Sequence, residues 1–472
     1  MDYDEFIAGK SQLGGSYGFE PLWMPDFLFD FQKHLVDWML RKGRSACFAD
    51  CGLGKSPMEL VCAENVARKT NGRVLLIMPL VVCDQMQSES EKFGIETAIC
   101  RDGKLPKSNI ILTNYERLHY FNPNDFQAAT CDESSAIKNF DGATKEAVTE
   151  FMRRLKYRGL WTATPSPNDY VELGTSSECL GELGYMDMLG RFFKAADGGS
   201  MAHGGLGGRF DRHANLWRHG DMFGGKFRFR GHAERDFWRW VCSWARACRK
   251  PSDLGFDDGK FVLPPLNINE HIVKARTPNP EFIIELPAVT LDEQRAERRR
   301  TINERCEMAA EFHNKHQGQS VAWCALNDEG DLLEKLIKDC VQISGKDSDE
   351  SKMEKLKAFR TGKVKCTVTK GEIAGWGINW QFANYMTYFA DHSFEKWYQC
   401  VRRLWRFGQT NPVNVDVIAS EAESRVLANQ QRKAAAAEEM FKQLVSLMNN
   451  ELKLEKQETG KSKAATPKWL VN

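Results

Sequence analysis

The chain has 472 residues, which is too long for one ordinary hydrophobic core and predicts two or three domains. With 42% hydrophobic and 27% charged residues, the composition is that of a globular protein and excludes disorder of the whole chain. Lys and Arg number 65 and Asp and Glu number 64, so the net charge indicates neither a nucleic-acid nor a membrane surface. Any such surface must be local.

Several features bear on where the protein acts. No run of about eighteen apolar residues occurs, so no membrane-spanning helix is expected. The N-terminal sequence MDYDEFIAGK is acidic and lacks the apolar centre of a secretory signal. The 14 cysteines include no CxxC pair and no Cys/His spacing typical of metal ligands. We therefore expect a cytoplasmic protein with reduced, mostly buried thiols, no structural zinc and no membrane partner.

The first half of the chain alternates short apolar runs with segments of helical periodicity. Helices are expected over Pro57–Lys69 and Gln85–Phe93. This alternation predicts an α/β domain built on a parallel sheet, although the run FQAATC is less apolar than a central strand usually is. The expected strands are Ala46–Ala49, Val74–Pro79, Ile110–Thr113, Phe126–Cys131 and Leu160–Thr162.

The composition changes between residues 185 and 262, where glycines, aromatic residues and arginines gather. Residues 191–250 hold 13 Lys and Arg against 5 Asp and Glu, a net charge of +8. We interpret this region as a basic, partly helical insertion at the end of the first domain. Leu263–Leu266 (LPPL) follows as a linker, because two consecutive prolines cannot continue a helix.

The α/β pattern returns after a highly charged helix expected over Leu291–His316. A C-terminal helix is expected over Glu421–Asn449, followed by a polar, Lys-rich end. The sequence thus predicts two tandem α/β domains, at residues 1–265 and 266–425, and a helical, then flexible tail at 426–472. The strands expected in the second domain are Ser320–Leu326, Val364–Thr369, Met386–Phe389 and Val413–Ile418.

The octapeptide ADCGLGKS, residues 49–56, is similar to a phosphate-binding loop of the type G-x-x-x-x-G-K-[ST], with Ala49 in place of the first glycine. In such a loop, backbone N–H groups at the start of the next helix hold phosphate oxygens. Lys55 would reach the β- and γ-phosphates, and Ser56 would bind Mg²⁺. The alternative is a glycine-rich turn before a helix, so the interpretation needs partners elsewhere in the chain.

Asp132 and Glu133 form a carboxylate pair suited to binding Mg²⁺ and to activating a water molecule. Asp-Glu pairs are also common on exposed helix faces, so the pair alone indicates little. Its position favours the functional interpretation, because it ends a predicted strand and follows Lys55 by 77 residues. Together the loop and the carboxylate pair predict a site for a nucleotide and Mg²⁺.

The order of these and further motifs resembles superfamily-two helicases, and within them the Swi/Snf-type DNA-dependent ATPases, whose phosphate loop reads A-D-x-G-L-G-K-[ST]. LFDFQKHLVDWML places Gln32 where this family has a glutamine that contacts adenine. VLLIMPLVVCDQMQSESEKF resembles the family's motif Ia, and IILTNYERL, with Thr113 and Asn114, resembles its motif Ib. CDESSAIKN parallels D-E-A-H-x-L-K-N with Ser135 in place of the histidine, and LWTATPSPNDYVEL is similar to motif III.

The second half of the chain continues the resemblance. TKGEIAGWGINWQFAN, which includes Gly377, is similar to motif V, and QCVRRLWRFGQTNPV is similar to motif VI. Gln399, Arg403 and Arg406 are in register with motif VI, whereas Arg402 replaces the family's aspartate. The compact chain is similar to phage-encoded members of the group. The resemblance implies two tandem RecA-like domains, each with a parallel sheet flanked by helices.

This resemblance covers residues 25–420 and implies an ATP site that is complete only when both domains meet. The second domain would supply Arg403 and Arg406, which would stabilise charge on the γ-phosphate; the alternative is a solvated helix face above packed aromatic residues. The implied catalytic residues are Lys55, Asp132, Glu133, Arg403 and Arg406. The implied ATP-binding residues are Gln32, Gly52, Gly54, Lys55, Ser56, Gly377 and Gln399, with Ser56 and Asp132 on Mg²⁺.

The expected partner is DNA, duplex or forked, bound with little sequence specificity. Motif Ib would hold the DNA backbone through Thr113 and Asn114. In the basic insertion, arginines would neutralise phosphates and aromatic residues would stack on bases. The alternative is that Phe237, Trp238, Trp240 and Trp244 form a helical core. The arginines considered are Arg228, Arg230, Arg235 and Arg239, with Arg246 and Arg249 further along the same segment.

The resemblance therefore implies an ATP-dependent DNA translocase or helicase that couples hydrolysis to movement on, or remodelling of, DNA in replication, recombination or repair. Two alternatives stay open. One is an RNA remodeller of the same superfamily. The other is a nucleotide-binding scaffold with weak turnover, which the departures at Ser135 and Arg402 would favour. The protein is expected to act as a monomer in a phage or bacterial setting, together with replication or recombination proteins.

Overall fold

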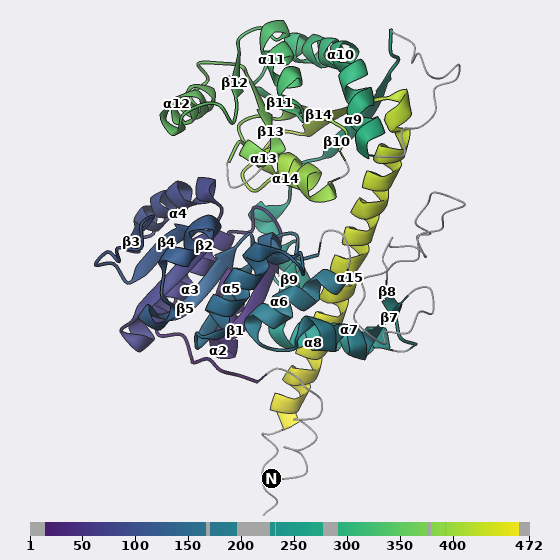
Figure 1. Cartoon of the computed structure of the whole chain (residues 1–472). Helices are drawn as coiled ribbons and strands as arrows, with labels where there is room; N and C mark the ends of the chain where they lie inside the picture. The colour runs from purple at the N-terminus through teal and green to yellow at the C-terminus, as the bar shows by residue number, and fades with distance from the viewer. Residues whose placement is uncertain are drawn as a thin grey trace, which may run out of the picture.

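The computed structural model describes residues 15–166, 170–195, 227–231, 233–276, 291–374, 379–391 and 393–461. Two separate sheets organise the chain, and within each sheet every paired strand runs parallel to its neighbour. Helices flank both sheets (Figure 1). The predicted fold class, two tandem RecA-like α/β domains, is confirmed.

The first sheet has the strand order β3-β4-β2-β5-β6-β1-β9. One strand, β6, separates β1 from β5, and the carboxyl ends of all three lie at the same edge, where parallel sheets form their ligand sites. The elements up to this point of the chain are α2 (Asp30–Lys42), β1 (Arg44–Ala49), α3 (Lys55–Thr70), β2 (Arg73–Met78), α4 (Leu80–Lys92), β3 (Thr97–Ile99), β4 (Ile110–Asn114), β5 (Phe126–Asp132), α5 (Ala143–Arg153), β6 (Tyr157–Trp161), α6 (Leu173–Leu180) and α7 (Tyr185–Phe192).

Strand β5 has the less apolar sequence FQAATC, yet it is a central strand between β2 and β6. Its small residues explain how. Ala128 and Ala129 are at most 2% exposed, and the hydroxyl of Thr130 donates to the buried carboxylate of Glu59. A polar residue therefore lies in the core without an unsatisfied hydrogen-bond donor.

The described part of the basic insertion completes the first domain. β7 (Phe193–Ala195) and β8 (Phe227–Phe229) form a two-stranded antiparallel ribbon, α8 (Ala233–Trp244) follows, and β9 (Ala245–Cys248) joins the sheet beside β1. The aromatic side chains of α8 are at most 3% exposed and belong to the first-domain core, which confirms the packing alternative for them. They are Phe237, Trp238, Trp240 and Trp244.

The second sheet has the strand order β10-β15-β14-β11-β13-β12. The helix predicted over Leu291–His316 is two helices, because Thr301 leaves helical dihedral angles (φ −100°, ψ 16°) while its hydroxyl donates to the carbonyl of Glu297. The elements are β10 (Leu266–Val273), α9 (Leu291–Arg300), α10 (Ile302–Lys315), β11 (Ser320–Cys324), α11 (Asn327–Leu336), β12 (Cys340–Ile343), α12 (Asp349–Arg360), β13 (Cys366–Lys370), α13 (Gly371–Ala374), β14 (Tyr385–Phe389), α14 (Phe394–Leu404) and β15 (Val413–Ser420).

The C-terminal helix α15 (Ser424–Lys461) has 38 residues and extends beyond the predicted end at Asn449. It leaves the second domain and runs along the first (Figure 1). Val426 and Leu427 are buried in the core of the second domain. Further along the same helix, a second group of apolar side chains is buried in the core of the first domain. These are Met440, Phe441, Leu444 and Met448. One helix therefore contributes to two cores.

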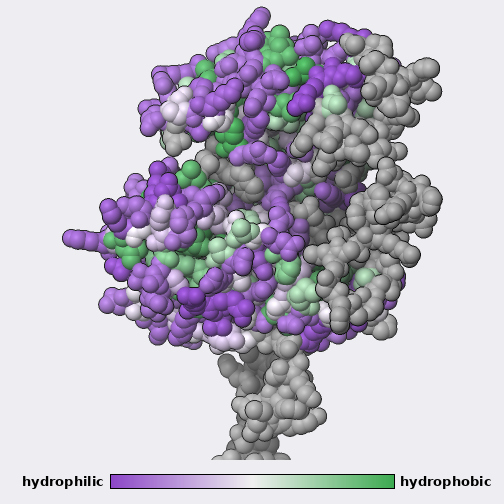
Figure 2. All heavy atoms as spheres, in the orientation of Figure 1, coloured by the Kyte–Doolittle hydropathy of each residue, from purple (hydrophilic) through white to green (hydrophobic). Residues whose placement is uncertain are grey.

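Hydrophilic residues cover most of the described surface in the view of Figure 2, with smaller hydrophobic areas on both domains. Among the described helices, none combines the length and apolar character that crossing a bilayer requires. All 14 cysteines are free thiols, and only Cys51 and Cys340 are partly exposed. The prediction that most thiols are small core residues is confirmed.

Candidate nucleotide site between the two domains

The phosphate loop lies between the end of β1 and the start of α3, as predicted. Ala49 is the last residue of β1 and is fully buried, so a small strand residue suits that position and no glycine is needed. Gly52 (φ +86°) and Gly54 (φ +74°) both lie in the left-handed region that favours glycine. Gly54 is the N-cap of α3, so the loop directs the first N–H groups of a 16-residue helix toward one place, an arrangement suited to an anion.

Lys55 lies inside this loop. Its Nζ donates to the backbone oxygens of Ala49 (3.0 Å) and Asp50 (3.3 Å). Burial alone would lower the pKa of Lys55, but nearby acidic groups, chiefly Cys51 and the carboxylates Glu133 and Asp132, raise it above its usual value. The side chain is therefore a cation beside the anion site.

The carboxylate pair ends β5 at the same sheet edge. Burial and the neighbouring Glu133 raise the pKa of Asp132 to about 7, and one oxygen of Asp132 accepts the backbone N–H of Glu133 at 2.9 Å. Glu133 has φ +49°, an uncommon value for a residue other than glycine, and its buried Oε2 has no hydrogen-bond partner among the described residues. Two buried carboxylates beside a phosphate loop suit a divalent cation and a water molecule.

Gln32 connects helix α2 to the phosphate loop. Its Nε2 donates to the backbone oxygen of Leu53 at 2.8 Å, and its Oε1 accepts the backbone N–H of Phe29 at 3.0 Å. A Cβ at Gly54 would lie 2.3 Å from that Nε2. The predicted adenine-contacting residue therefore lies against the loop, and its amide is held by backbone groups on both sides.

The second domain reaches the loop through α14 and the residues that follow it. A Cβ at Gly52 would lie 2.8 Å from the backbone nitrogen of Phe407 and 3.5 Å from the Cβ of Arg406. Burial, and then the like charge of Arg403, lower the pKa of Arg406 to about 10. Arg403 donates to the backbone oxygen (3.1 Å) and the Oε1 (2.7 Å) of Gln399. The structure thus brings both predicted arginines to the phosphate loop, although they follow it in the sequence by some 350 residues.

Two side chains at this boundary had no assigned role in the sequence. Tyr398 and Arg402, both on α14, donate to the carboxylate of Asp50 in the phosphate loop. The one sequence signal was the departure of Arg402 from the motif VI pattern. A further ion pair joins Lys138 of the first domain to Glu395 of the second.

The residues predicted to contact DNA divide into two groups. Thr113 (1% exposed) and Asn114 (4% exposed) end β4, and the Asn114 side chain donates to Glu116 at 2.5 Å. The others are exposed side chains on β8, on α8 and between them; Arg230, which lies between them, also donates to the backbone oxygen of Phe193. They are Arg228, Arg230, Arg235 and Arg239.

Arg246 and Arg249 have structural roles. Arg246 is 4% exposed, and its guanidinium lies 4.1 Å from the ring centroid of Trp38. Arg249 pairs with Glu438 of α15 and stacks 4.5 Å from the ring centroid of Phe441. The remaining predicted site residue, Gly377, lies outside the described residues.

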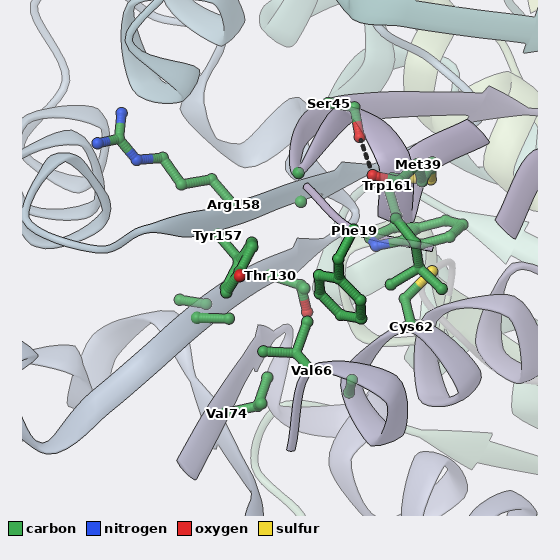
Figure 3. Close-up of a pocket in the computed structure, with 16 residues that line it drawn as sticks. Phe19, Met39, Ser45, Cys62, Val66, Val74, Thr130, Tyr157, Arg158 and Trp161 are labelled. Carbon is green, nitrogen blue, oxygen red and sulfur yellow. Dashed lines mark hydrogen bonds between the residues drawn. The ribbon is translucent and has the colours of Figure 1, made fainter. Parts of the chain in front are cut away.

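A small cavity in the first domain lies away from this site. It has a volume of about 40 Å³ and is lined mainly by apolar side chains of α2, α3 and the sheet, including Met39, Cys62 and Trp161 (Figure 3). Its lining includes the middle of β5 and most of β6, but none of the phosphate loop, Asp132 or Glu133. Its small volume and apolar lining do not suit a nucleotide. Among the described residues, no cluster of three or more His, Cys, Asp or Glu side chains could hold a metal ion.

No family model matches this sequence, and no curated protein does. A solved structure, the SWI2/SNF2 ATPase core of Sulfolobus solfataricus in complex with dsDNA, is similar with 18% sequence identity and a TM-score of 0.40. The match covers 85% of this chain and 90% of that chain. The assignment of the site depends on the geometry described above.

Proposed function

We propose that the protein is a DNA-stimulated ATPase that moves on or remodels DNA, with ATP bound between its two domains. The observation that supports this most is the meeting of three groups at one boundary. These are the phosphate loop, the Asp132-Glu133 pair and the arginines that follow from α14. The loop and the carboxylate pair share one sheet edge of the first domain, and the contact of the two domains adds the arginines.

The first domain would bind the nucleotide and its metal. The N-terminus of α3 would hold the phosphates, Lys55 would neutralise their charge, and Gln32 would lie beside the adenine. Ser56 and Asp132 would hold Mg²⁺, which when bound neutralises charge on the β- and γ-phosphates. Glu133, with its unpartnered buried oxygen, would orient the attacking water and accept its proton.

The second domain would supply the positive charge needed at the terminal phosphate. Arg403 and Arg406 are three residues apart at the end of α14, beside the phosphate loop. Arginines in this role contribute about 10³–10⁵ in rate. Because these arginines and Lys55 belong to different domains, hydrolysis would depend on the domains closing, and repeated closing would drive movement along the track.

DNA is the proposed track, contacted through its phosphate backbone with little sequence specificity. The exposed arginines of β8 and α8 support this, since exposed arginines can neutralise DNA phosphates. We propose duplex or forked DNA as the substrate and a monomer as the working unit. Replication, recombination or repair is the proposed setting, with partner proteins providing recruitment.

One ATPase panel tests the proposal, with duplex DNA, single-stranded DNA, forked DNA and RNA compared in parallel and strand displacement scored beside it. We expect duplex or forked DNA to stimulate hydrolysis several-fold, and Lys55→Ala to abolish it. Lys335→Ala, an exposed lysine on α11, is the matched control. Stimulation by RNA alone would identify an RNA remodeller. If a folded preparation hydrolyses no ATP with any nucleic acid, the proposal is wrong.

Arg403→Ala separates the two domains' contributions. We expect this variant to bind ATP as the parent does, because the phosphate loop is intact, while kcat falls by at least about 10³. Binding is measured with a fluorescent ATP analogue and turnover by phosphate release. Turnover equal to that of the parent would remove Arg403 from the site.

A further inference from the structure

Asp50 makes several hydrogen bonds that shape the phosphate loop. Its backbone N–H donates to Cys248 at the end of β9 (2.9 Å), and its backbone oxygen accepts from Leu53 (3.3 Å) and from Lys55 Nζ (3.3 Å). One carboxylate oxygen accepts the backbone N–H of Cys51 at 2.6 Å. The carboxylate is therefore held by the loop that it shapes.

The same carboxylate is the point where the second domain is attached. Tyr398 Oη donates to Asp50 Oδ1, and Arg402 Nη2 donates to Oδ2. The Arg402 and Asp50 side chains are only 8% and 4% exposed. The Arg402 guanidinium lies between aromatic rings, 4.4 Å from the centroid of Trp405 and 5.2 Å from that of Tyr398. Burial and the neighbouring rings therefore leave the Arg402–Asp50 ion pair little conformational freedom.

A buried ion pair contributes little net stability, because removing both charges from water costs about as much as their attraction returns. Its effect is on specificity, since each charge is strongly unfavourable in this place without the other. Asp50 and Arg402 are on different domains, so each would be hydrated if the domains separated. The pair therefore favours one register of α14 against the phosphate loop over nearby alternatives.

That register determines where the arginines of the site lie. Tyr398 and Arg402 are four residues apart and share one face of α14, and Arg403 is the next residue around the helix. Arg406 follows directly beyond the end of the helix, beside Gly52. Because Arg402 is held on Asp50, the rotation of α14 and its distance from the phosphate loop are held as well. The positions of Arg403 and Arg406 relative to Lys55 are set in this way.

We infer that Arg402 is a positioning residue for hydrolysis, which acts through Arg403 and Arg406 by pairing with Asp50. This inference rests on the ATPase activity proposed above and assigns a role to a residue at which the chain departs from the motif VI pattern. In this chain Arg402 stands where the family has an aspartate, and it pairs with the carboxylate of Asp50 in the first domain.

The test compares Asp50→Asn, Arg402→Gln and the double variant by kcat and KM for ATP at saturating DNA. We expect each single substitution to lower kcat at least about 10-fold, and Arg402→Gln, which leaves the phosphate loop intact, to change KM less than about threefold. The double variant should lie within about threefold of the single variants, because the two residues act as one unit. If Arg402→Gln fails to fold, the double variant, in which neither charge is left buried alone, provides the measurement.

Arg305→Gln is the control, since Arg305 forms a still more deeply buried ion pair with Glu329 inside the second domain. It should lower thermal stability while kcat of the folded protein stays within about twofold of the parent. The inference is overturned if Arg402→Gln keeps kcat within about twofold, or if the effects of the two single substitutions multiply in the double variant. A parent without turnover overturns the ATPase proposal and this inference together, whereas an active parent with an unaffected Arg402→Gln overturns this inference alone.

Discussion

Replacing Gly52 by alanine should disrupt turnover without unfolding the protein. Gly52 has φ +86°, and an L residue there costs about 1–2 kcal/mol. The added methyl would also lie 2.8 Å from the backbone nitrogen of Phe407 in the second domain, where no side chain can rotate away. The two domains must therefore move apart locally. Since a misplacement of about 1 Å can cost about 10²-fold in rate, we expect kcat to fall about 10- to 100-fold.

Gly255→Ala isolates the backbone contribution to this effect. Gly255 has almost the same φ, +83°, but a Cβ there would meet nothing within 4 Å. Gly255→Ala should lower the melting temperature by a few degrees and Gly52→Ala by at least as much, whereas only Gly52→Ala should lose DNA-stimulated ATP hydrolysis. Phosphate release at saturating ATP and DNA measures the difference. If Gly52→Ala hydrolyses ATP as fast as Gly255→Ala, the contact between the loop and Phe407 does not bear on catalysis.

Three further outcomes follow from other parts of the molecule. Phe441→Ala, which removes a 4% exposed side chain of α15 from the first-domain core, should cost about 3–5 kcal/mol in urea unfolding. A loss below about 1 kcal/mol would mean that α15 is not anchored there. Arg235→Gln and Arg239→Gln should each lower the salt dependence of DNA binding by about one unit of slope, and an unchanged slope would place the DNA elsewhere. Burial would raise the pKa of Asp416, but side-chain hydrogen bonds from Tyr385, His271 and Asn269 lower it. The carboxylate therefore stabilises the fold at neutral pH, and this stabilisation is lost as the pH falls through the lowered pKa. Asp416→Asn should therefore be less stable than the parent at pH 7 and approach it in acid; an equal difference at both pH values would contradict this.

The sequence could predict the first domain's half of the site because that half is local. A strand, a glycine turn and a helix follow one another within residues 44–70, and the carboxylate pair stands at the end of a single strand, β5. Periodicity and turn chemistry act over such distances. The predicted strands and helices around Lys55 and Asp132 are confirmed, with ends that differ by a few residues.

Contacts between distant segments could not be predicted in this way. The pairing of Asp50 with Arg402 joins residues 352 positions apart and depends on how two domains meet. Charge counting likewise cannot distinguish an exposed arginine from a paired one. Arg246 and Arg249 contribute to the same net positive charge as Arg235, yet one is buried over Trp38 and the other is paired with α15. Tertiary packing decides these cases.

Helix α15 connects the domains a second time, in addition to the chain between β9 and β10. Its two anchors, at Leu427 and Met440, are separated by about 20 Å of helix at 1.5 Å per residue. The alanine run Ala434–Ala437 lies between them, and alanine is the residue that best maintains a helix without outside support. A helix bends far more easily than it stretches. While both anchors stay buried, the length of helix between them limits how far the domains can separate along its axis, and we expect their relative motion to be bending or rotation about this helix.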